Sequence, residues 1–357
     1  MEKTMLWFAL ALSAMLSSLF IPIVISFCHK HRLYDRINDR KVHKDSRMPR
    51  LGGVAIAFSF VISILFLQLL QKDEFIRMNG GYSLWPIITG GLIVFLTGLL
   101  DDLYDLRAMT KFALQSLAAL IVIASGYRFK FMIIPFGAGI LDFGNVSYLL
   151  TFLWLVGITN AINLIDGIDG LAGGISALAA LAFGLFFMFT SSILPAEICL
   201  ALVGSLIGFL IFNLPPAKIF MGDSGSLFLG YILAVIPLMS QYRGFQGEDI
   251  GVFSAATVLS IPIFDTLMAI FRRTRARKSF FTSDREHLHH KLMEKGYQTP
   301  QILVILYSLT FMLGMVALST LFIHASWSFA LNLIMLGAMF AYFVRINQES
   351  RRTEARR

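Results

Sequence analysis

Long apolar runs alternate along this chain with shorter polar connections, and each run is about the length of a membrane-spanning helix. We predict about eleven spans from this pattern, each placed to within a few residues. They cover about residues 5–27, 51–70, 84–100, 112–127, 148–164, 170–190, 194–212, 224–240, 251–271, 301–323 and 326–344. The stretch 127–146, which contains Pro135 and several glycines, is predicted to form a hairpin or a re-entrant loop instead. The predicted fold is an all-α, polytopic integral membrane protein.

The composition agrees with a membrane protein. Hydrophobic residues make up 57% of the chain and charged residues 15%, whereas about 25% charged residues is typical of soluble domains. The N-terminal apolar run reaches Phe27 and is too long for a typical signal-peptide core, so we expect it to be the first span. Cys28 and Cys199 lie in or beside apolar runs and indicate no disulfide framework. We expect one polytopic domain over residues 1–345 and a basic cytoplasmic tail over residues 346–357.

Positive charge is concentrated in alternate connections. Of the 30 Lys and Arg residues, 24 fall in the segments 29–50, 101–111, 213–223 and 272–300 and in the tail from residue 345. Basic loops stay in the cytoplasm, so with about eleven spans the N-terminus lies outside and the C-terminus inside. Because these charges lie between apolar runs and do not cover a folded surface, we expect no nucleic-acid partner. All the acidic motifs then reach the cytoplasmic side of the membrane.

The first acidic motif, DDLYD at residues 101–105, ends the third predicted span. In a continuous helix Asp101 and Asp105 share one face, while Asp102 points elsewhere. Such carboxylates repel one another unless a cation or a basic group neutralises them, and Mg²⁺ binds to a few carboxylates together with substrate phosphates. The alternatives are a catalytic base or a solvated helix end. Lys111, which begins the next span, is a candidate phosphate ligand or an interfacial lysine.

The second motif, NAINLIDGIDG at residues 160–170, is more specific. Asn160, Asn163 and Asp166 recur every three residues and line one side if the segment is helical, and Asp169 continues the series. Polar side chains within an apolar region cost free energy unless they have partners. The stripe therefore indicates a binding site or, alternatively, a set of interhelical hydrogen bonds.

The third motif, MGDSGS at residues 221–226, places Asp223 at the start of a span. Either Asp223 or Ser224 is suited to capping the helix. The functional interpretation is a metal ligand at a helix N-terminus, where backbone N–H groups also favour phosphate.

Basic and histidine residues mark two further cytoplasmic connections. The longer one carries a cluster without nearby cysteines, so phosphate or sugar hydroxyls are more plausible ligands for it than zinc. This cluster consists of Arg285, His287, His289 and His290. The other connection contains RKVH at residues 40–43 and PRLGG at residues 49–53, with His43 and Arg50 as candidate site residues.

Taken together, these motifs resemble those of the polyprenyl-phosphate N-acetylhexosamine-1-phosphate transferases. The resemblance extends from residue 40 to about residue 297 and rests on RKxH, PRxGG, DDxxD with Lys111, NAxNxxDGxDGL, MGDSGS and HLHH in family order. The HLHH pattern is closer to the branch that uses UDP-N-acetylglucosamine than to the branch that uses UDP-muramoyl-pentapeptide. The resemblance implies transfer of a sugar-1-phosphate to undecaprenyl phosphate with release of UMP. This is the first lipid-linked step of an envelope polysaccharide such as lipopolysaccharide or teichoic acid, at the bacterial inner membrane.

The resemblance also implies roles at the phosphate groups. Asp223 would hold Mg²⁺, with Mn²⁺ as an alternative, and Asn163 would be a second ligand. Asp101 would handle the lipid phosphate with the support of Asp102, and Lys111 would bind phosphate. A phosphate monoester has a second pKa near 6, so Asp101 need not act as a base. Direct attack and a covalent phospho-enzyme path predict the same residues.

Other motifs would bind the rest of the donor. Asp169 would read the uracil, with Asp166 and Asn160 in the same nucleotide pocket, and Asp166 is also a candidate catalytic group. The sugar and diphosphate ligands would be Arg285, His287, His289 and His290. His43 and Arg50 would support the lipid phosphate or the loops.

Two alternatives stay open at this point. The same chemistry is compatible with another UDP-N-acetylhexosamine or with UDP-muramoyl-pentapeptide as donor. A transporter would also have many spans, but its acidic residues should lie near mid-membrane in two matching halves. Gly204 and Gly208 form a GxxxG motif that fits packing within the chain better than a homodimer contact.

Overall fold

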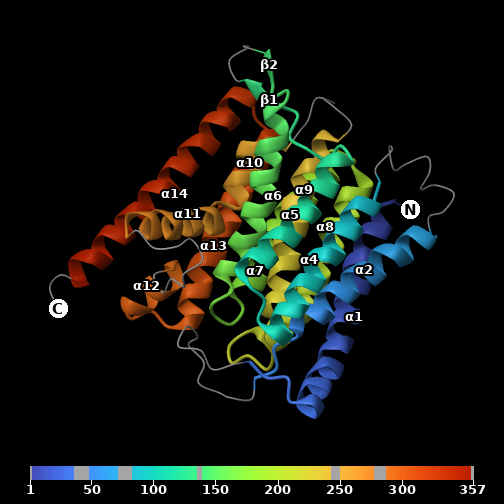
Figure 1. The fold of residues 1–357 in the computed structure, drawn as a ribbon. Coiled ribbons are helices and arrows are strands. Elements are labelled where there is room, and N and C mark those ends of the chain that lie inside the picture. The colour runs from blue at the N-terminus through green and yellow to red at the C-terminus, as the bar shows by residue number, and fades with distance from the viewer. Residues whose placement is uncertain are drawn as a thin grey trace.

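The computed structural model describes residues 2–35, 48–70, 83–134, 139–242, 250–276 and 287–354 (Figure 1). The part it describes is a bundle of helices with one small hairpin. The elements are α1 (Glu2–His31), α2 (Gly52–Leu70), α4 (Trp85–Tyr104), α5 (Ala108–Ala124), β1 (Phe131–Ile134), β2 (Gly139–Asp142), α6 (Val146–Ile165), α7 (Leu171–Phe189), α8 (Ile193–Asn213), α9 (Gly222–Gln241), α10 (Val252–Val258), α11 (Ser260–Arg275), α12 (Leu288–Glu294), α13 (Thr299–Leu318), η1 (Ser319–Leu321) and α14 (Ala325–Glu354).

Helices long and apolar enough to cross a membrane make up most of the bundle. Within the described ranges there are 9, or 10 if the bent pair α10–α11 is one span. The prediction of a polytopic, helical membrane protein is therefore confirmed. Each of the predicted runs contains a helix, but α5 has only 17 residues. The count of eleven spans and the orientation of the termini stay predictions.

The predicted span 251–271 is broken by a sharp bend, which the apolar run did not predict. α10 ends at Val258, and α11 starts at Ser260 after a bend of 84°. Pro262 has no N–H to donate to the carbonyl of Val258, and its ring would clash with that carbonyl in a continuous helix. In Figure 1, α11 accordingly lies across the direction of the neighbouring helices.

The stretch after α5 forms a β-hairpin. Of the two predicted possibilities, a hairpin or a re-entrant loop, the hairpin is therefore confirmed. β1 and β2 pair antiparallel, with Phe131 opposite Asp142. The side chain of Gln241 at the end of α9 supports this hairpin, since its Oε1 accepts from the backbone N–H of Lys130 at 2.7 Å. The hairpin lies at the opposite end of α5 and α6 from the acidic motifs, and Figure 1 shows it at the top of the bundle.

α9 occupies the centre of the bundle. All its residues from 224 to 239 are buried, and it packs against α4, α6 and α2. On the outside, α8 packs closely against α1, because a β-carbon at Gly204 would lie 2.2 Å from the carbonyl oxygen of Leu10. A β-carbon at Gly208 would meet Ala14 in the same way, at 2.6 Å. The GxxxG motif thus serves packing within the chain.

Candidate active site

Asp102 caps the central helix. Its Oδ1 accepts a hydrogen bond from the backbone N–H of Asp223 (2.9 Å), and its Oδ2 accepts one from that of Ser224 (3.0 Å). These N–H groups at the start of α9 have no partner within the helix, and a carboxylate there also interacts favourably with the helix dipole. The cap is thus supplied by α4 and not by Asp223 or Ser224. Asp102 joins the first acidic motif to the third and fixes the position of Asp223.

Gly98 allows this contact, one turn earlier on α4. A β-carbon there would lie 2.3 Å from the carbonyl oxygen of Asp223. Only a glycine lets the two helix backbones approach so closely. The first turn of α2 reaches the same point, since Gly53 N–H donates to the carbonyl of Met221 at 2.8 Å. PRxGG therefore packs directly on MGDSGS, and half-buried Arg50 lies beside the site.

Lys111 links two carboxylates from different helices. Its Nζ lies 2.8 Å from Oδ2 of Asp101 and 3.4 Å from Oδ2 of Asp223. Asp101 Oδ1 also accepts a hydrogen bond from the backbone N–H of Leu106, at 2.7 Å. One ammonium group thus offsets the repulsion between two acids that the fold brings together. The side chain of Asp223 remains 34% exposed, so it is open to a ligand.

Asp105 does not share a helix face with Asp101. α4 ends at Tyr104, and Asp105 adopts a left-handed conformation (φ 61°) in the connection to α5. Its side chain is exposed, while those of Asp101 and Asp102 are buried at the α9 end. Of the three acids in DDxxD, the first two therefore belong to the site.

The second motif supplies one direct partner of Asp223. Asn163 Nδ2 donates to Oδ1 of Asp223 (3.1 Å) and to Oγ of Ser226 (2.8 Å). One turn earlier on α6, Asn160 donates to Oε1 of Gln115 at 2.7 Å. Gln115, on α5, was not among the predicted site residues. Its only sequence signal is a polar side chain within an apolar run.

The stripe of four polar residues does not continue along one helix face. α6 ends at Ile165, Asp166 is the first residue after it, and Asp169 lies in the turn that leads to α7. Asp169 is 6% exposed, and its Oδ2 accepts a hydrogen bond from the backbone N–H of Ala217 at 3.1 Å. The helix ends before Gly167, and Gly170 adopts a positive φ (78°) in the turn to α7, which a count of spacing alone cannot show.

The histidine cluster docks on this same turn. His287 precedes α12, and its Nδ1 lies 2.7 Å from Oδ2 of Asp265 on α11, while Leu288 N–H donates to Asp265 Oδ1 at 2.8 Å. His289 is 2% exposed and packs against Gly167, where a β-carbon would lie 2.3 Å from its Nε2. The HLHH and NAxNxxDG motifs are therefore neighbours in space.

Burial determines the charge state of His289. Desolvation, with a smaller contribution from neighbouring His290, lowers its pKa from 6.5 to about 3. Among the described residues, neither ring nitrogen of His289 has a hydrogen-bond partner. Buried polar atoms without partners are rare in folded proteins, and two on one ring indicate a place for a ligand or water.

Asp265 is a site residue that the sequence interpretation missed. It is 2% exposed and holds both His287 and the start of α12. A lone acid in the apolar run 261–271 was the available signal. Two predicted residues, His43 and Arg285, lie outside the described residues.

The donor atoms suit a hard divalent cation. The described residues contain no group of three or more His, Cys, Asp or Glu arranged to hold a metal ion. Mg²⁺ needs fewer protein ligands, since it binds one or two carboxylates together with substrate phosphates. The partly exposed Asp223 carboxylate meets that requirement, while the Asn163 atom beside it is the amide nitrogen, so Asn163 would have to turn its amide oxygen toward the ion to bind it.

Comparisons with known proteins agree with the motifs. Residues 84–241 match the family model described as glycosyl transferase family 4. The chain is 35% identical to a protein of Bacillus subtilis (strain 168) named probable undecaprenyl-phosphate N-acetylglucosaminyl 1-phosphate transferase, over 83% of this chain and 80% of that protein. It is 33% identical to the decaprenyl-phosphate N-acetylglucosaminephosphotransferase of Mycobacterium tuberculosis (strain CDC 1551 / Oshkosh), over 84% and 78%. It is also 37% identical to the phospho-N-acetylmuramoyl-pentapeptide-transferase of Lactobacillus acidophilus, over 76% and 88%. The chain therefore belongs to glycosyl transferase family 4, among the polyprenyl-phosphate N-acetylhexosamine-1-phosphate transferases.

Proposed function

We propose that this protein transfers N-acetylglucosamine-1-phosphate from UDP-N-acetylglucosamine to undecaprenyl phosphate. The products are UMP and undecaprenyl-diphosphate-N-acetylglucosamine, the first lipid-linked intermediate of an envelope polysaccharide. The observation that carries this proposal is the cluster in which Lys111 contacts both Asp101 and Asp223 at the start of α9. It combines a cation, a partly exposed carboxylate and a helix N-terminus, which are features that phosphoryl transfer requires.

The reaction joins two anionic substrates at one phosphorus atom. An oxygen of the lipid phosphate attacks the phosphorus that carries the sugar, and the bond from that phosphorus to the bridging oxygen breaks, so UMP takes the electron pair. We favour direct attack because two carboxylates of the cluster, those of Asp101 and Asp102, are already engaged in hydrogen bonds, and the third, Asp223, is assigned to the metal ion. Asp102 accepts from two backbone N–H groups, and Asp101 from Leu106 and Lys111.

The side chains of the cluster have different roles in the proposed reaction. Lys111 binds a phosphate oxygen, and Asp101 orients the Lys111 ammonium group at 2.8 Å. Since much of the acceptor phosphate is already dianionic at neutral pH, Asp101 is needed more for orientation than as a base. Asp223 and Asn163 would hold Mg²⁺, or Mn²⁺ in its place, and a bound ion offsets the negative charge of the phosphates.

The donor extends from this cluster toward α12. The turn that carries Asp166 and Asp169 lies next to His289, so a nucleotide held there has its diphosphate near the histidine cluster. Asp169 and Asp166, with Asn160 nearby, are assigned to the nucleotide. The sugar and diphosphate are assigned to Arg285, His287, His289 and His290.

The choice of N-acetylglucosamine rests on the HLHH pattern and on the names of relatives such as those in Bacillus subtilis and Mycobacterium tuberculosis. Another UDP-N-acetylhexosamine and UDP-muramoyl-pentapeptide are the alternatives, and the latter has a relative of its own. We further assign the protein to the bacterial inner membrane, with the site on the cytoplasmic face, and a homodimer is compatible with the fold.

The test is an assay of the purified full-length protein with undecaprenyl phosphate and radiolabelled UDP-sugars. We expect label to enter the extractable lipid from UDP-N-acetylglucosamine, and EDTA to stop the reaction until Mg²⁺ or Mn²⁺ is restored. Transfer from UDP-muramoyl-pentapeptide alone would show that the proposed donor is wrong and that the proposed type of reaction is right. No transfer from any UDP-sugar would overturn the proposal.

A further inference from the structure

Gly170, the last residue of the turn between α6 and α7, is held by side chains from two other helices. Its N–H donates to Oδ1 of Asn213 at the end of α8, at 2.9 Å. Its carbonyl oxygen accepts two hydrogen bonds, from the N–H of Gly174 (2.9 Å) and from the hydroxyl of Tyr307 on α13. A carbonyl oxygen has two lone pairs, so the hydrogen-bonding capacity of the Gly170 backbone is fully used.

Tyr307 lies directly against the start of α7. A β-carbon at Gly174 would lie 2.0 Å from the hydroxyl oxygen of Tyr307, so only a glycine leaves room for the tyrosine ring. Tyr307 follows the start of α13 by about two turns. Long side chains on a helix lean toward its N-terminus, which for α13 is the end next to α12. The hydroxyl therefore reaches the same turn as the histidine cluster does.

This turn carries the groups assigned to the donor nucleotide. Asp169 directly precedes Gly170, and its Oδ2 accepts a hydrogen bond from the N–H of Ala217 at 3.1 Å. Gly167, in the same turn, lies against His289. A displacement of Gly170 would therefore move the Asp169 carboxylate and change the contact with α12.

A second tyrosine has the same arrangement at the other end of the bundle. A β-carbon at Gly90 of α4 would lie 2.1 Å from the hydroxyl oxygen of Tyr231 on α9. That hydroxyl donates to the carbonyl of Pro86 at 3.2 Å. In each pair the accepting carbonyl lies four residues before the glycine, close to the start of a helix. Pro86 is roughly 22 Å from Asp101 along α4, so this contact is remote from the candidate active site.

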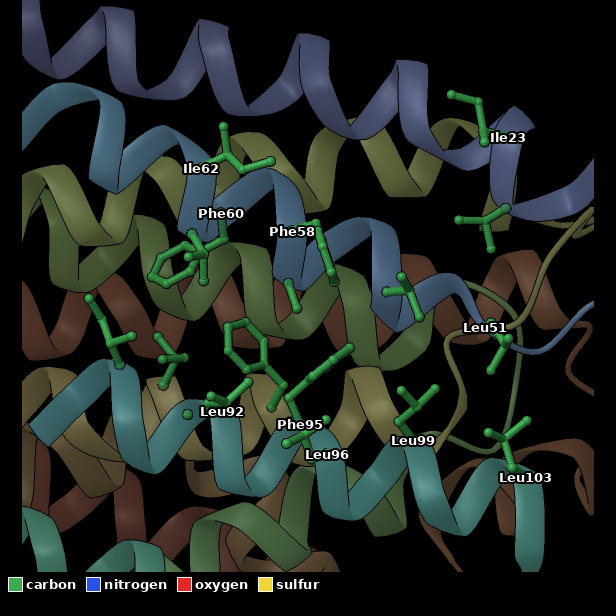
Figure 2. A pocket seen from close by; sticks show the side chains of 18 of the residues that line it. Ile23, Leu51, Phe58, Phe60, Ile62, Leu92, Phe95, Leu96, Leu99 and Leu103 are labelled. Carbon is green, nitrogen blue, oxygen red and sulfur yellow. The ribbon is translucent and has the colours of Figure 1, made fainter. Parts of the chain in front are cut away.

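The Tyr231 contact borders apolar surface. The residues that directly follow its two partners, Ile87 and Ile232, line an apolar groove between α1, α2 and α4 (Figure 2). Every residue that lines this groove is hydrophobic or a glycine, and none belongs to the candidate active site. Tyr231 therefore provides a matched control, because its hydroxyl fixes the start of a helix without contact to the donor turn.

We propose that Tyr307 is a positioning residue for the donor nucleotide. Its hydroxyl fixes the carbonyl of Gly170 and thereby the turn that carries Asp166 and Asp169. This inference rests on the proposed function. Without the hydroxyl, Gly170 still accepts from Gly174, so the first turn of α7 remains and the loss falls on the position of the turn.

The first measurement is the kinetics of Tyr307→Phe, which removes the hydroxyl and adds no atom. We expect the KM for the UDP-sugar to rise about threefold to tenfold, the effect of one neutral hydrogen bond, with kcat within about twofold. The KM for the lipid acceptor should also stay within about twofold, as should all three values for Tyr231→Phe. An unchanged UDP-sugar KM in Tyr307→Phe, or an equal rise in both variants, would overturn the inference.

A second pair of variants displaces each tyrosine ring and keeps its hydroxyl. Gly174→Ala places a methyl group where the Tyr307 ring lies, and Gly90→Ala does the same to Tyr231. The KM for the UDP-sugar should rise at least about threefold in Gly174→Ala, because the ring must leave its place, and stay within about twofold in Gly90→Ala. Equal UDP-sugar KM values in the two alanine variants would count against the role of Tyr307.

UMP binding tests the inference without turnover. Calorimetric titration of the purified full-length proteins with UMP should give a Kd about threefold to tenfold higher for Tyr307→Phe than for the wild type. Tyr231→Phe should bind UMP as the wild type does. Equal UMP affinities for the wild type and Tyr307→Phe would overturn the inference alone, whereas a wild type that binds no UMP would overturn the proposed function as well.

Discussion

At the scale of single residues, the site depends on how each carboxylate is paired. Asp102 is committed to two backbone N–H groups, and Asp101 to Lys111 and Leu106. Asp223 is held by Lys111 and Asn163 but is still one-third exposed. In the proposed reaction Asp102 and Asp101 are therefore positioning residues, and Asp223 is the acid of the three with access to a ligand.

Asp223→Asn should remove nearly all transfer activity while the protein stays folded. The substitution keeps the size of the side chain but removes the charge that would hold Mg²⁺ and that faces Lys111 at 3.4 Å. The measurement is radiolabel transfer into lipid, together with the melting temperature. The control is Asp142→Asn on the hairpin at the far end of α5 and α6, which should keep wild-type turnover. Turnover of Asp223→Asn near the wild-type value would show that the metal assignment is wrong.

Asp265→Asn should lower kcat/KM for the UDP-sugar donor and leave the KM for the lipid acceptor unchanged. Asn has one oxygen, so it cannot accept hydrogen bonds from both His287 and Leu288 as Asp265 does. Losing one bond to a charged group costs about 1.5–3 kcal/mol, so kcat/KM for the UDP-sugar should fall at least about tenfold. Kinetics with each substrate varied in turn test this. Equal losses for both substrates would instead indicate general loosening of α12.

The buried His289 should make stability depend on pH. Its pKa is about 3 in the folded protein against 6.5 for an unperturbed histidine, so below pH 6.5 the unfolded chain binds a proton that the folded protein does not. Stability should therefore fall as the pH drops from about 6.5 towards 3, with no contribution from His289 above that range. His287, His290 and Asp265 face the same region and can also change stability with pH. The contribution of His289 is therefore the difference between the pH curves of the melting temperature for the wild type and for His289→Asn. Parallel curves for the two proteins would contradict the prediction.

At the scale of elements, the sequence predicted the helices well and their ends poorly. Apolar runs define the helices because membrane thickness sets their length. The ends depend on a few backbone angles, such as the positive φ of Asp105 and the turn after Ile165, which spacing does not reveal. Asp102 was predicted as a site residue, but its capping of α9 joins residues 121 positions apart in the chain. Asp265 was missed because its partner His287 lies on another element.

Gly98→Val tests the crossing of α4 and α9. A β-carbon at Gly98 would lie 2.3 Å from the carbonyl oxygen of Asp223, so the helices must separate to accept valine. We expect a loss of about 1–3 kcal/mol in stability, seen as a lower melting temperature, and loss of transfer activity. Gly157→Val on α6 is the control for valine in a helix, since that site is open. If Gly98→Val and Gly157→Val have the same melting temperature and the same transfer activity, the close approach of α4 to α9 does not position the site.

At the scale of the whole molecule, the site end and the hairpin end of the bundle must face opposite sides of the membrane. α5 leads away from the acidic cluster to the hairpin, and α6 returns to it (Figure 1). Among the described residues, Lys111, Lys218 and Lys291 lie in the segments that form the site end. Since basic connections stay in the cytoplasm, we expect that end in the cytoplasm.

Single cysteines introduced at the two ends test this orientation. Cys28 and Cys199 are fully buried and should react little, so new cysteines can be read directly. In cells with an intact inner membrane, a membrane-impermeant maleimide should label Asp142→Cys on the hairpin and leave Glu294→Cys on α12 unlabelled until the membrane is opened. Both positions are exposed, so a difference in labelling reports the side of the membrane and not burial. Labelling of Glu294→Cys in intact cells would place the site on the outer side of the membrane. UDP-sugars are made in the cytoplasm and would not reach it there. That result would contradict both the orientation expected from the basic residues and the proposed donor.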